Sequence, residues 1–228
     1  MTGQRDRSGP VTGRRDRRAL IRPLAWVVLA GIGLTVLSSL AARDGTVSAP
    51  ERWVFEAING LPDWLERPMW ALQLLGVLVT PVLIAVVLLV LRRWRPALAL
   101  LLLVPLKLVA ERQILKQLVE RNRPGQTESN PILRDVPPAG LSSPSGHAIV
   151  AAAMLVILWP YLGRTGRVVA TLLAVGVGVA RIYLGAHNPL DVLAGAAAGL
   201  VIASVLNLLL LPHHSTARDP EPEPAPTT

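Results

Sequence analysis

The 228-residue sequence contains no cysteine. It therefore has neither a disulfide framework nor a thiolate metal site, so an oxidising compartment is permitted but not indicated. The sequence also lacks internal repeats, apart from a succession of apolar blocks, and it has no segment with the composition of a soluble domain. Hydrophobic residues make up 51% of the chain and the mean hydropathy is +0.45, which places the protein outside the ordinary soluble globular class.

The net charge of +8 is concentrated near the start of the chain, where residues 1–22 contain seven arginines against only Asp6 and Asp16. This charge would suggest a nucleic-acid partner if it were spread over a soluble fold, but its position beside an apolar block favours a role in membrane topology. We predict that residues 1–22 and 213–228 are disordered cytoplasmic tails, that residues 23–212 form one membrane domain, and that no nucleic acid is bound.

Six apolar blocks are predicted to cross a bilayer core, which takes about 20 helical residues. The first block loosely resembles a signal peptide at Ser39-Leu40-Ala41, but it is longer than a usual signal segment, so an uncleaved anchor is the prediction. The predicted fold class is therefore all-α, an integral-membrane six-helix bundle. Its predicted spans are residues 24–42, 69–91, 96–110 with a helix continuing to about Asn122, 146–162, 168–184 and 189–211.

Two connecting segments have a distinct character. Residues 43–68 mix charges with Trp, Phe, Ile and Leu, which predicts an amphipathic segment in the headgroup region, a plain extracytoplasmic loop being the alternative. Residues 124–144 are rich in Pro, Gly, Ser and Asn, which predicts a loop.

Two short basic turns, Arg92–Arg95 and Arg164–Arg167, fix the predicted orientation. Counting six spans from an inner N-terminus places both turns inside, as the positive-inside rule expects. The same count leaves both termini in the cytoplasm and brings residues 112–146 and 185–189 together on the extracytoplasmic face. The predicted location is the plasma (inner) membrane, crossed several times.

Lys107 interrupts the third apolar block. A lysine at the centre of a spanning helix costs roughly 2.5 to 3.5 kcal/mol on translocon scales. We expect it to pair with Glu111 one helical turn on, or to face the bundle interior, rather than to act in catalysis.

Three polar clusters converge at the predicted outer face. Lys116 and Arg123 are seven residues apart, which is two helical turns, so both are expected to point from nearly the same side of the third helix or its end. The other clusters are Pro144-Ser145-Gly146-His147 at the start of the fourth span, and Arg181, His187 and Asp191 around the fifth and sixth spans.

These residue types suit a phosphoryl-transfer site. Lys116, Arg123 and Arg181 would neutralise a phosphate dianion, while Ser145 and the Gly146 N–H lie at a helix N-terminus that favours anions. His187 would attack phosphorus and form a phosphohistidine, and Asp191 would hold its other ring nitrogen in the right tautomer.

His147 would protonate the leaving oxygen, since an unperturbed imidazole titrates near pH 6.5. The carboxylates near these clusters are too few and scattered to cage a hard cation, so no metal and no other cofactor is predicted.

Each residue has a simpler explanation when taken alone. His187 and His147 could be interfacial histidines, Lys116 and Arg123 headgroup-level cations, and Ser145 a helix cap. Asp191 could belong to a helix with Asn188 as N-cap and Pro189 at its first position. Arg181 near the end of an apolar span needs a partner or a ligand, and the conjunction of the three clusters favours a site.

At these residues the sequence resembles the type 2 phosphatidic acid phosphatase family. That family's pattern is a lysine, six residues and Arg-Pro, then Pro-Ser-Gly-His, then Ser-Arg, five residues, His, three residues and Asp. Here it is matched by Lys116 to Arg123-Pro124, by Pro144 to His147, and by Arg181 to Asp191 through His187. Ala180 replaces the pattern's serine, which removes a possible hydrogen bond of about 0.5 to 1.5 kcal/mol to a phosphate.

The resemblance implies metal-independent hydrolysis of a lipid phosphate monoester or diphosphate, with His187 as nucleophile and His147 as acid. Polyprenyl diphosphate, phosphatidic acid and phosphatidylglycerophosphate remain open as substrates, and the partners implied are this lipid and the bilayer.

Vanadate-dependent haloperoxidases resemble the same pattern, but they are soluble and six apolar spans argue against them. A non-catalytic protein that binds or transports phospholipids is the other alternative. No oligomeric state is predicted.

Overall fold

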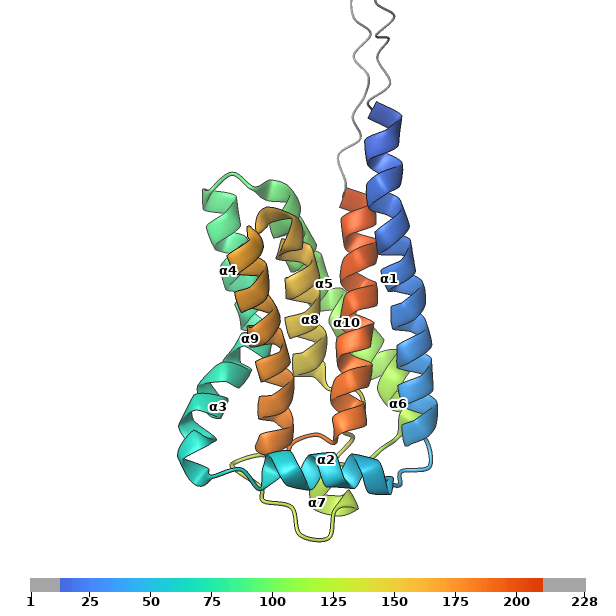
Figure 1. Cartoon of the computed structure of the whole chain (residues 1–228), viewed down its shortest axis with the longest axis vertical. Helices are drawn as coiled ribbons and strands as arrows, with labels where there is room; N and C mark the ends of the chain where they lie inside the picture. Colours follow the sequence, from blue (N-terminus) through green and yellow to red (C-terminus); the bar gives the residue numbers. More distant parts are fainter. Residues whose placement is uncertain (1–12, 211–228) are drawn as a thin grey trace, which may run out of the picture.

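A computed structural model describes residues 13–210 of the chain. The long helices of the described chain lie side by side along the long axis of the molecule (Figure 1). They are α1 (Gly13–Ala42), α4 (Val79–Val90), α5 (Trp94–Leu108), α8 (Gly146–Leu158), α9 (Arg164–Tyr183) and α10 (Pro189–Leu210). The predicted all-α six-helix bundle is confirmed. Residues 13–22, expected within a tail, begin α1, while residues 1–12 and the predicted tail 213–228 lie outside the described part.

Apolar length supports a membrane location for these helices. Arg22–Ala42 of α1, the whole of α9 and the whole of α10 are each long and apolar enough to span a bilayer core. Their outward faces carry exposed large apolar side chains, such as Leu37, Leu172 and Leu209. In a bilayer these side chains would contact lipid.

Glycine residues let α10 lie close to its neighbours. A Cβ on Gly199 would lie 2.3 Å from Ile149 O of α8, and one on Gly195 would lie 2.4 Å from Ser145 O. Gly195 and Gly199 are four residues apart on one face, the small-residue spacing that lets spanning helices approach. This contact seats the start of α8 against the start of α10.

The second predicted span, residues 69–91, is broken rather than continuous. It consists of α3 (Glu66–Gln73), the 3₁₀ turn η2 (Leu74–Gly76) and α4, with a bend of 61° between the two arms. A Cβ on Gly76 would lie 2.7 Å from the Cβ of His147. The break therefore brings backbone against α8 at a position that only glycine tolerates.

The third span also departs from a regular helix. After α5 the chain forms a π-helical segment, η3 (Val109–Leu115), and then α6 (Lys116–Val119). Glu120 ends α6 in the left-handed conformation with φ +46°. The helix therefore ends at Val119, before the predicted end near Asn122, and Arg123 lies in the segment beyond it.

An interfacial helix, α2 (Ala49–Asn59), crosses one end of the bundle beneath α9 and α10 (Figure 1). Ser48 caps it, with Ser48 Oγ accepting the Glu51 N–H at 3.4 Å. One face buries Glu51, Phe55 and Asn59, while Trp53 on the other face is 71% exposed. This is the amphipathic character that the sequence predicted for the segment after the first span.

The 3₁₀ turn η1 (Asp63–Leu65) follows α2, and the short helix α7 (Pro124–Thr127) lies within the loop predicted at residues 124–144. The opposite end of the bundle carries the turns between α4 and α5 and between α8 and α9 (Figure 1). There α8 ends in a 3₁₀ turn, η4 (Trp159–Tyr161).

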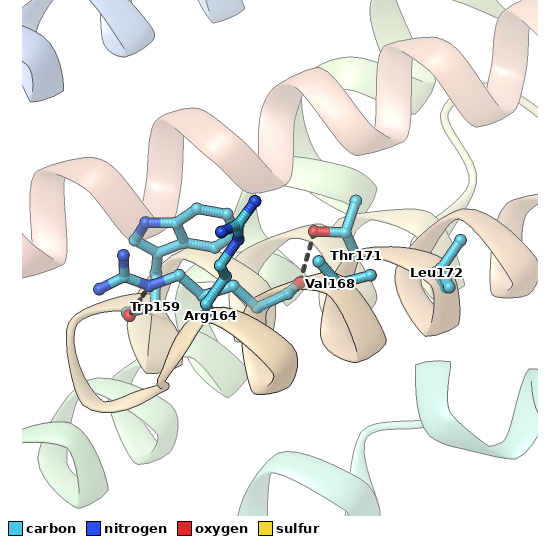
Figure 2. Close-up of a pocket in the computed structure, with 6 residues that line it drawn as sticks. Trp159, Arg164, Val168, Thr171 and Leu172 are labelled. Carbon is cyan, nitrogen blue, oxygen red and sulfur yellow. Dashed lines mark hydrogen bonds between the residues drawn. The ribbon is translucent and has the colours of Figure 1, made fainter.

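At this opposite end, the Arg167 guanidinium carbon lies 5.2 Å from the centre of the Trp159 ring, and Arg167 Nε donates to Trp159 O at 3.2 Å. Figure 2 shows Arg164 beside the same indole ring, with Val168 and Leu172 further along α9. Tryptophan and arginine next to apolar residues are typical of the headgroup level of a bilayer.

Candidate functional site

Backbone hydrogen bonds join the first two polar clusters at the end of the bundle that carries α2 and α7. Asn122 and Leu141 form an isolated antiparallel β-bridge. Beside it, the Ser142 N–H donates to Arg121 O at 2.7 Å. The chain around Arg123 is thereby held against the segment that leads into α8.

The third cluster is tied to the other two in the same way. The Ser145 N–H donates to Asp191 O at 2.9 Å, which connects the start of α8 to the first turn of α10. Arg123 Nη1 donates at 3.3 Å to Ala186 O, the carbonyl just before His187. The structure therefore brings the three predicted clusters into one site.

A tight turn between α9 and α10 presents His187, which is 3% exposed. Gly185 in this turn has φ +76°, and a Cβ on it would lie 2.6 Å from Ile132 O. Only glycine fits both the conformation and the space. Pro189 begins α10, as predicted, and Asn188 precedes it.

Ser142 stands between His187 and Asp191. Its Oγ lies 3.3 Å from His187 Nδ1 and donates to Asp191 Oδ2 at 2.5 Å. Asp191 also accepts the Asn188 N–H at 2.8 Å and Arg121 Nη1 at 3.4 Å. The sequence predicted a direct hydrogen bond from the His187 ring to Asp191, and none occurs within residues 13–210. The Ser142 hydroxyl lies between the two side chains instead.

Arg121 is fully buried and is held from two directions. Its Nη1 and Nη2 both lie 2.8 Å from the carboxylate of Glu51 on α2, a bidentate pair, and Nη1 also reaches Asp191. Glu51 Oε1 in turn accepts the Leu190 N–H at 3.0 Å, at the start of α10. The interfacial helix is therefore part of the support of this site.

The surroundings of His187 keep its imidazole neutral. Burial lowers the pKa of His187 well below 6.5, and the positive charges of Arg181 and Arg123 lower it further. A neutral ring has a free nitrogen lone pair, which a nucleophile requires.

Lys116 and Arg181 have protein partners at the site. Lys116 Nζ lies 2.9 Å from Glu111 Oε1, and Glu111 also pairs with Lys107, as expected for that buried lysine. Arg181 Nη1 donates to the side-chain oxygen of Gln73, at the end of α3. Each cation is held in place while part of its donor capacity remains open.

The start of α8 has the features of an anion site. Ser145 is its N-cap residue, yet Ser145 Oγ makes no capping bond and, like Arg181 Nε, is buried without a hydrogen-bond partner within the described chain. Buried donors are normally paired, so these unpaired donors could serve a ligand that accepts hydrogen bonds, and a helix N-terminus favours an anion. A Cβ on Gly146 would lie 2.6 Å from Glu111 Oε2, so a larger residue there would displace the Glu111 carboxylate.

No group of three or more histidine, aspartate or glutamate side chains suited to a metal ion occurs in residues 13–210. The polar groups that surround His187 are instead mainly cationic, which suits an anion and repels a divalent cation.

Four residues of the site were missed by sequence reasoning: Gln73, Ser142, Arg121 and Glu51. Ser142 and Arg121 are close in sequence to predicted site residues, and this closeness could have identified them as members of the site. Glu51 and Gln73 are 70 and 108 residues from their partners, and no local pattern connects them.

The fold and the site together define a helical integral-membrane protein with a cluster of cationic and histidine side chains at one end. The chain belongs to the PAP2 superfamily, which matches residues 70–212 and so includes all three clusters.

Among curated proteins, the phosphatidylglycerophosphatase B of Bacillus subtilis (strain 168) is 32% identical over 100 residues. That match covers 40% of this chain and 46% of the relative, so the chain matches less than half of the relative's length.

Two solved structures share the fold. The transmembrane PAP2-type phosphatidylglycerolphosphate phosphatase from Bacillus subtilis has a TM-score of 0.61 at 24% identity, covering 80% of this chain and 94% of the other. The LpxE of Aquifex aeolicus has a TM-score of 0.56 at 23% identity, covering 70% and 95% respectively. At these identities the likeness concerns the fold.

Proposed function

We propose that this protein is a membrane lipid phosphatase that hydrolyses a lipid phosphate monoester or diphosphate through a phosphohistidine intermediate. The observation that carries the proposal is the buried His187 in a site with two buried donors, Ser145 Oγ and Arg181 Nε, that have no hydrogen-bond partner within residues 13–210. Membership of the PAP2 superfamily and the phosphatase relatives support the same class of reaction.

In the proposed first step, the lone pair of His187 Nε2 forms a bond to phosphorus. The bond from phosphorus to the lipid oxygen breaks, and that oxygen takes the electron pair and a proton from His147. Arg123, Arg181 and the amides at the start of α8 stabilise the charge on the three equatorial oxygens. Water then attacks phosphorus, His147 takes a proton from it, and the N–P bond breaks to release phosphate.

We propose that this reaction needs no metal ion. The three cations of the site supply the charge stabilisation that magnesium supplies in many other phosphoryl-transfer enzymes. This part of the proposal rests on the chemistry of the residues present.

The substrate is proposed as a lipid whose phosphate enters the pocket while its tail stays in the bilayer. The relative's name makes phosphatidylglycerophosphate the first lipid to test, followed by phosphatidic acid and a polyprenyl diphosphate. The cations of the site suit the phosphate group, which all three lipids share.

We also propose that the site faces the extracytoplasmic side. The site lies at the α2 end of the bundle, and the basic turns near residues 92–95 and 164–167 lie at the other end (Figure 1). Basic turns are retained on the cytoplasmic side, so the opposite end faces outward.

The test is phosphate release by the detergent-purified protein in EDTA, from the three lipids. We expect release by the wild type, a loss of at least about 10³-fold in kcat for His187→Ala, and no loss for His213→Ala, outside the family match.

Equal release by wild type and His187→Ala would refute the proposed nucleophile. Activity lost in EDTA and restored by magnesium would refute metal independence. Lipid binding without any phosphate release would favour the alternative of a non-catalytic phospholipid-binding or transporting protein.

A further inference from the structure

Ser142 belongs to none of the three motifs, yet its hydroxyl lies within hydrogen-bond distance of the ring of the proposed nucleophile. It is fully buried, and its hydroxyl lies between His187 Nδ1 at 3.3 Å and Asp191 Oδ2 at 2.5 Å. A hydroxyl has one proton to donate and two lone pairs that accept. The direction of each hydrogen bond therefore decides the tautomer of the histidine.

The partners of Asp191 settle that direction. Its side chain accepts from the Ser142 hydroxyl, from the Asn188 N–H and from Arg121 Nη1, three donors that suit an ionised carboxylate. Since the Ser142 proton is directed to Asp191, its oxygen is left to accept. The group it accepts from is the Nδ1–H of His187.

We propose that Ser142 is a positioning residue. It holds the proton of His187 on Nδ1, leaves Nε2 free for attack, and connects the ring to the Asp191 carboxylate through two hydrogen bonds. The proposal rests on the proposed function, which makes His187 the nucleophile. When Nε2 bonds to phosphorus, the ring becomes positive and its proton stays on Nδ1. No proton moves to Ser142 or Asp191, because the serine only strengthens its two hydrogen bonds.

Arg121 and Glu51 hold the Asp191 carboxylate, the final acceptor of the hydrogen bonds that run from His187 through Ser142. Arg121 holds Asp191 Oδ1, and both of its terminal nitrogens lie 2.8 Å from the Glu51 carboxylate. Glu51 pairs with both terminal nitrogens of Arg121, so the guanidinium is fixed in contact with Asp191 Oδ1. The chain of contacts thus runs from α2 at the membrane surface to the ring of His187.

Ser143 offers a matched control for Ser142. It is the next residue, it is also fully buried, and its Oγ has no hydrogen-bond partner within residues 13–210. Replacing either serine by alanine removes one buried hydroxyl group from this loop. Only the loss at Ser142 removes a bond to the histidine.

The experiment compares wild type, Ser142→Ala, Ser142→Thr and Ser143→Ala. The measurements are kcat and KM for phosphate release, inhibition by inorganic phosphate, and the ¹⁵N shifts of His187, assigned by their absence in His187→Ala. Nitrogen shifts report which ring nitrogen carries the proton, a property that a merely structural role would not change.

We expect Ser142→Ala to lower kcat by about ten- to a hundred-fold, the range for a hydrogen bond to a charged group, with KM and phosphate inhibition within about two-fold. The ¹⁵N shifts of its His187 should change from a single Nδ1–H tautomer to a mixture. Ser142→Thr, which keeps the hydroxyl, should recover most of kcat and the single tautomer, and Ser143→Ala should match wild type.

Wild-type kcat together with an unchanged Nδ1–H tautomer in Ser142→Ala would overturn the proposal. If that variant does not purify as a folded protein, Ser142→Cys replaces it, because a thiol of similar shape is a weak hydrogen-bond group and should move kcat and the tautomer in the same direction. If the wild type releases phosphate from no lipid, the proposed function fails, and the nitrogen shifts still decide the role of Ser142.

Discussion

Lys107 and Glu111 illustrate how single charged residues are accommodated inside this bundle. Both are buried, and they form an ion pair one helical turn apart in which Glu111 also holds Lys116. Removing one member of such a pair leaves a buried charge without compensation, which costs more than the pair itself contributes. Lys107 is therefore a structural partner of the carboxylate that positions a proposed phosphate-binding lysine.

The neutral state of His187 leads to a prediction about pH. Burial and the charges of Arg181 and Arg123 lower its pKa, so the ring stays unprotonated when the pH falls through 6.5. An unperturbed histidine would be mostly protonated at pH 6. We expect the NMR signals of His187 in ¹³C-labelled protein to show no titration between pH 7.5 and 5.5.

A short histidine peptide in the same buffer supplies the control, with its midpoint near pH 6.5. A midpoint at or above that of the peptide for His187 would contradict the cationic surroundings described for the ring. The lowered pKa of His187 also affects stability. Below pH 6.5 the unfolded chain binds the proton more readily than the folded protein, so the free energy of unfolding falls as the pH drops.

Among the elements, α10 has the most demanding role, because it connects the site to the bundle core. Its first turn carries Asp191, and its glycines contact α8 at Ile149 O and Ser145 O. Since Ser145 lies at the N-terminus of α8, the spacing between these two helices also sets the position of the proposed anion site.

Gly199→Ala tests this close contact. The added methyl group would lie 2.3 Å from Ile149 O, a backbone atom that cannot rotate away, so the two helices must separate. We expect the free energy of unfolding to fall by about 1 to 3 kcal/mol, the usual cost of overpacking, measured as a lower thermal midpoint in detergent.

Gly33→Ala on α1 is the matched control, because no atom lies within 4 Å of the Cβ it would add. Its thermal midpoint should be unchanged or slightly higher, since alanine favours helix more than glycine does. Equal midpoints for the two variants would mean that α8 and α10 do not depend on this contact.

At the scale of the whole molecule, the two ends of the bundle differ in chemistry. One end has the Trp159 and Arg167 contact with its basic turn, and the other has α2, α7 and the proposed site. Helices that span a bilayer place these ends on opposite sides of the membrane. The orientation then decides from which side the lipid headgroup is reached.

Single-cysteine labelling measures this orientation, because the chain has no cysteine of its own. Ser129 is exposed at the site end and Thr165 is exposed at the other end. We expect Ser129→Cys to react with an impermeant maleimide in intact cells and Thr165→Cys to react only after permeabilisation. The reverse pattern would place the proposed site in the cytoplasm.

The sequence by itself determined the class of fold and the members of the three clusters. Apolar blocks of spanning length leave few alternatives to helices in a bilayer, because every backbone polar group must be paired within its own segment. Two predictions from neighbouring residues are also confirmed: Pro189 begins α10, and Lys107 pairs with Glu111.

Only the tertiary structure decided where the helices break and what lies between His187 and Asp191. The break near Gly76, where the backbone packs against His147, the π-helical segment before Lys116 and the left-handed Glu120 correspond to no local pattern in the sequence. Ser142 and Glu51 approach the site through contacts 45 and 139 residues apart in the chain. Contacts of that separation arise only when the bundle has formed, because folding, rather than chain proximity, brings those groups together.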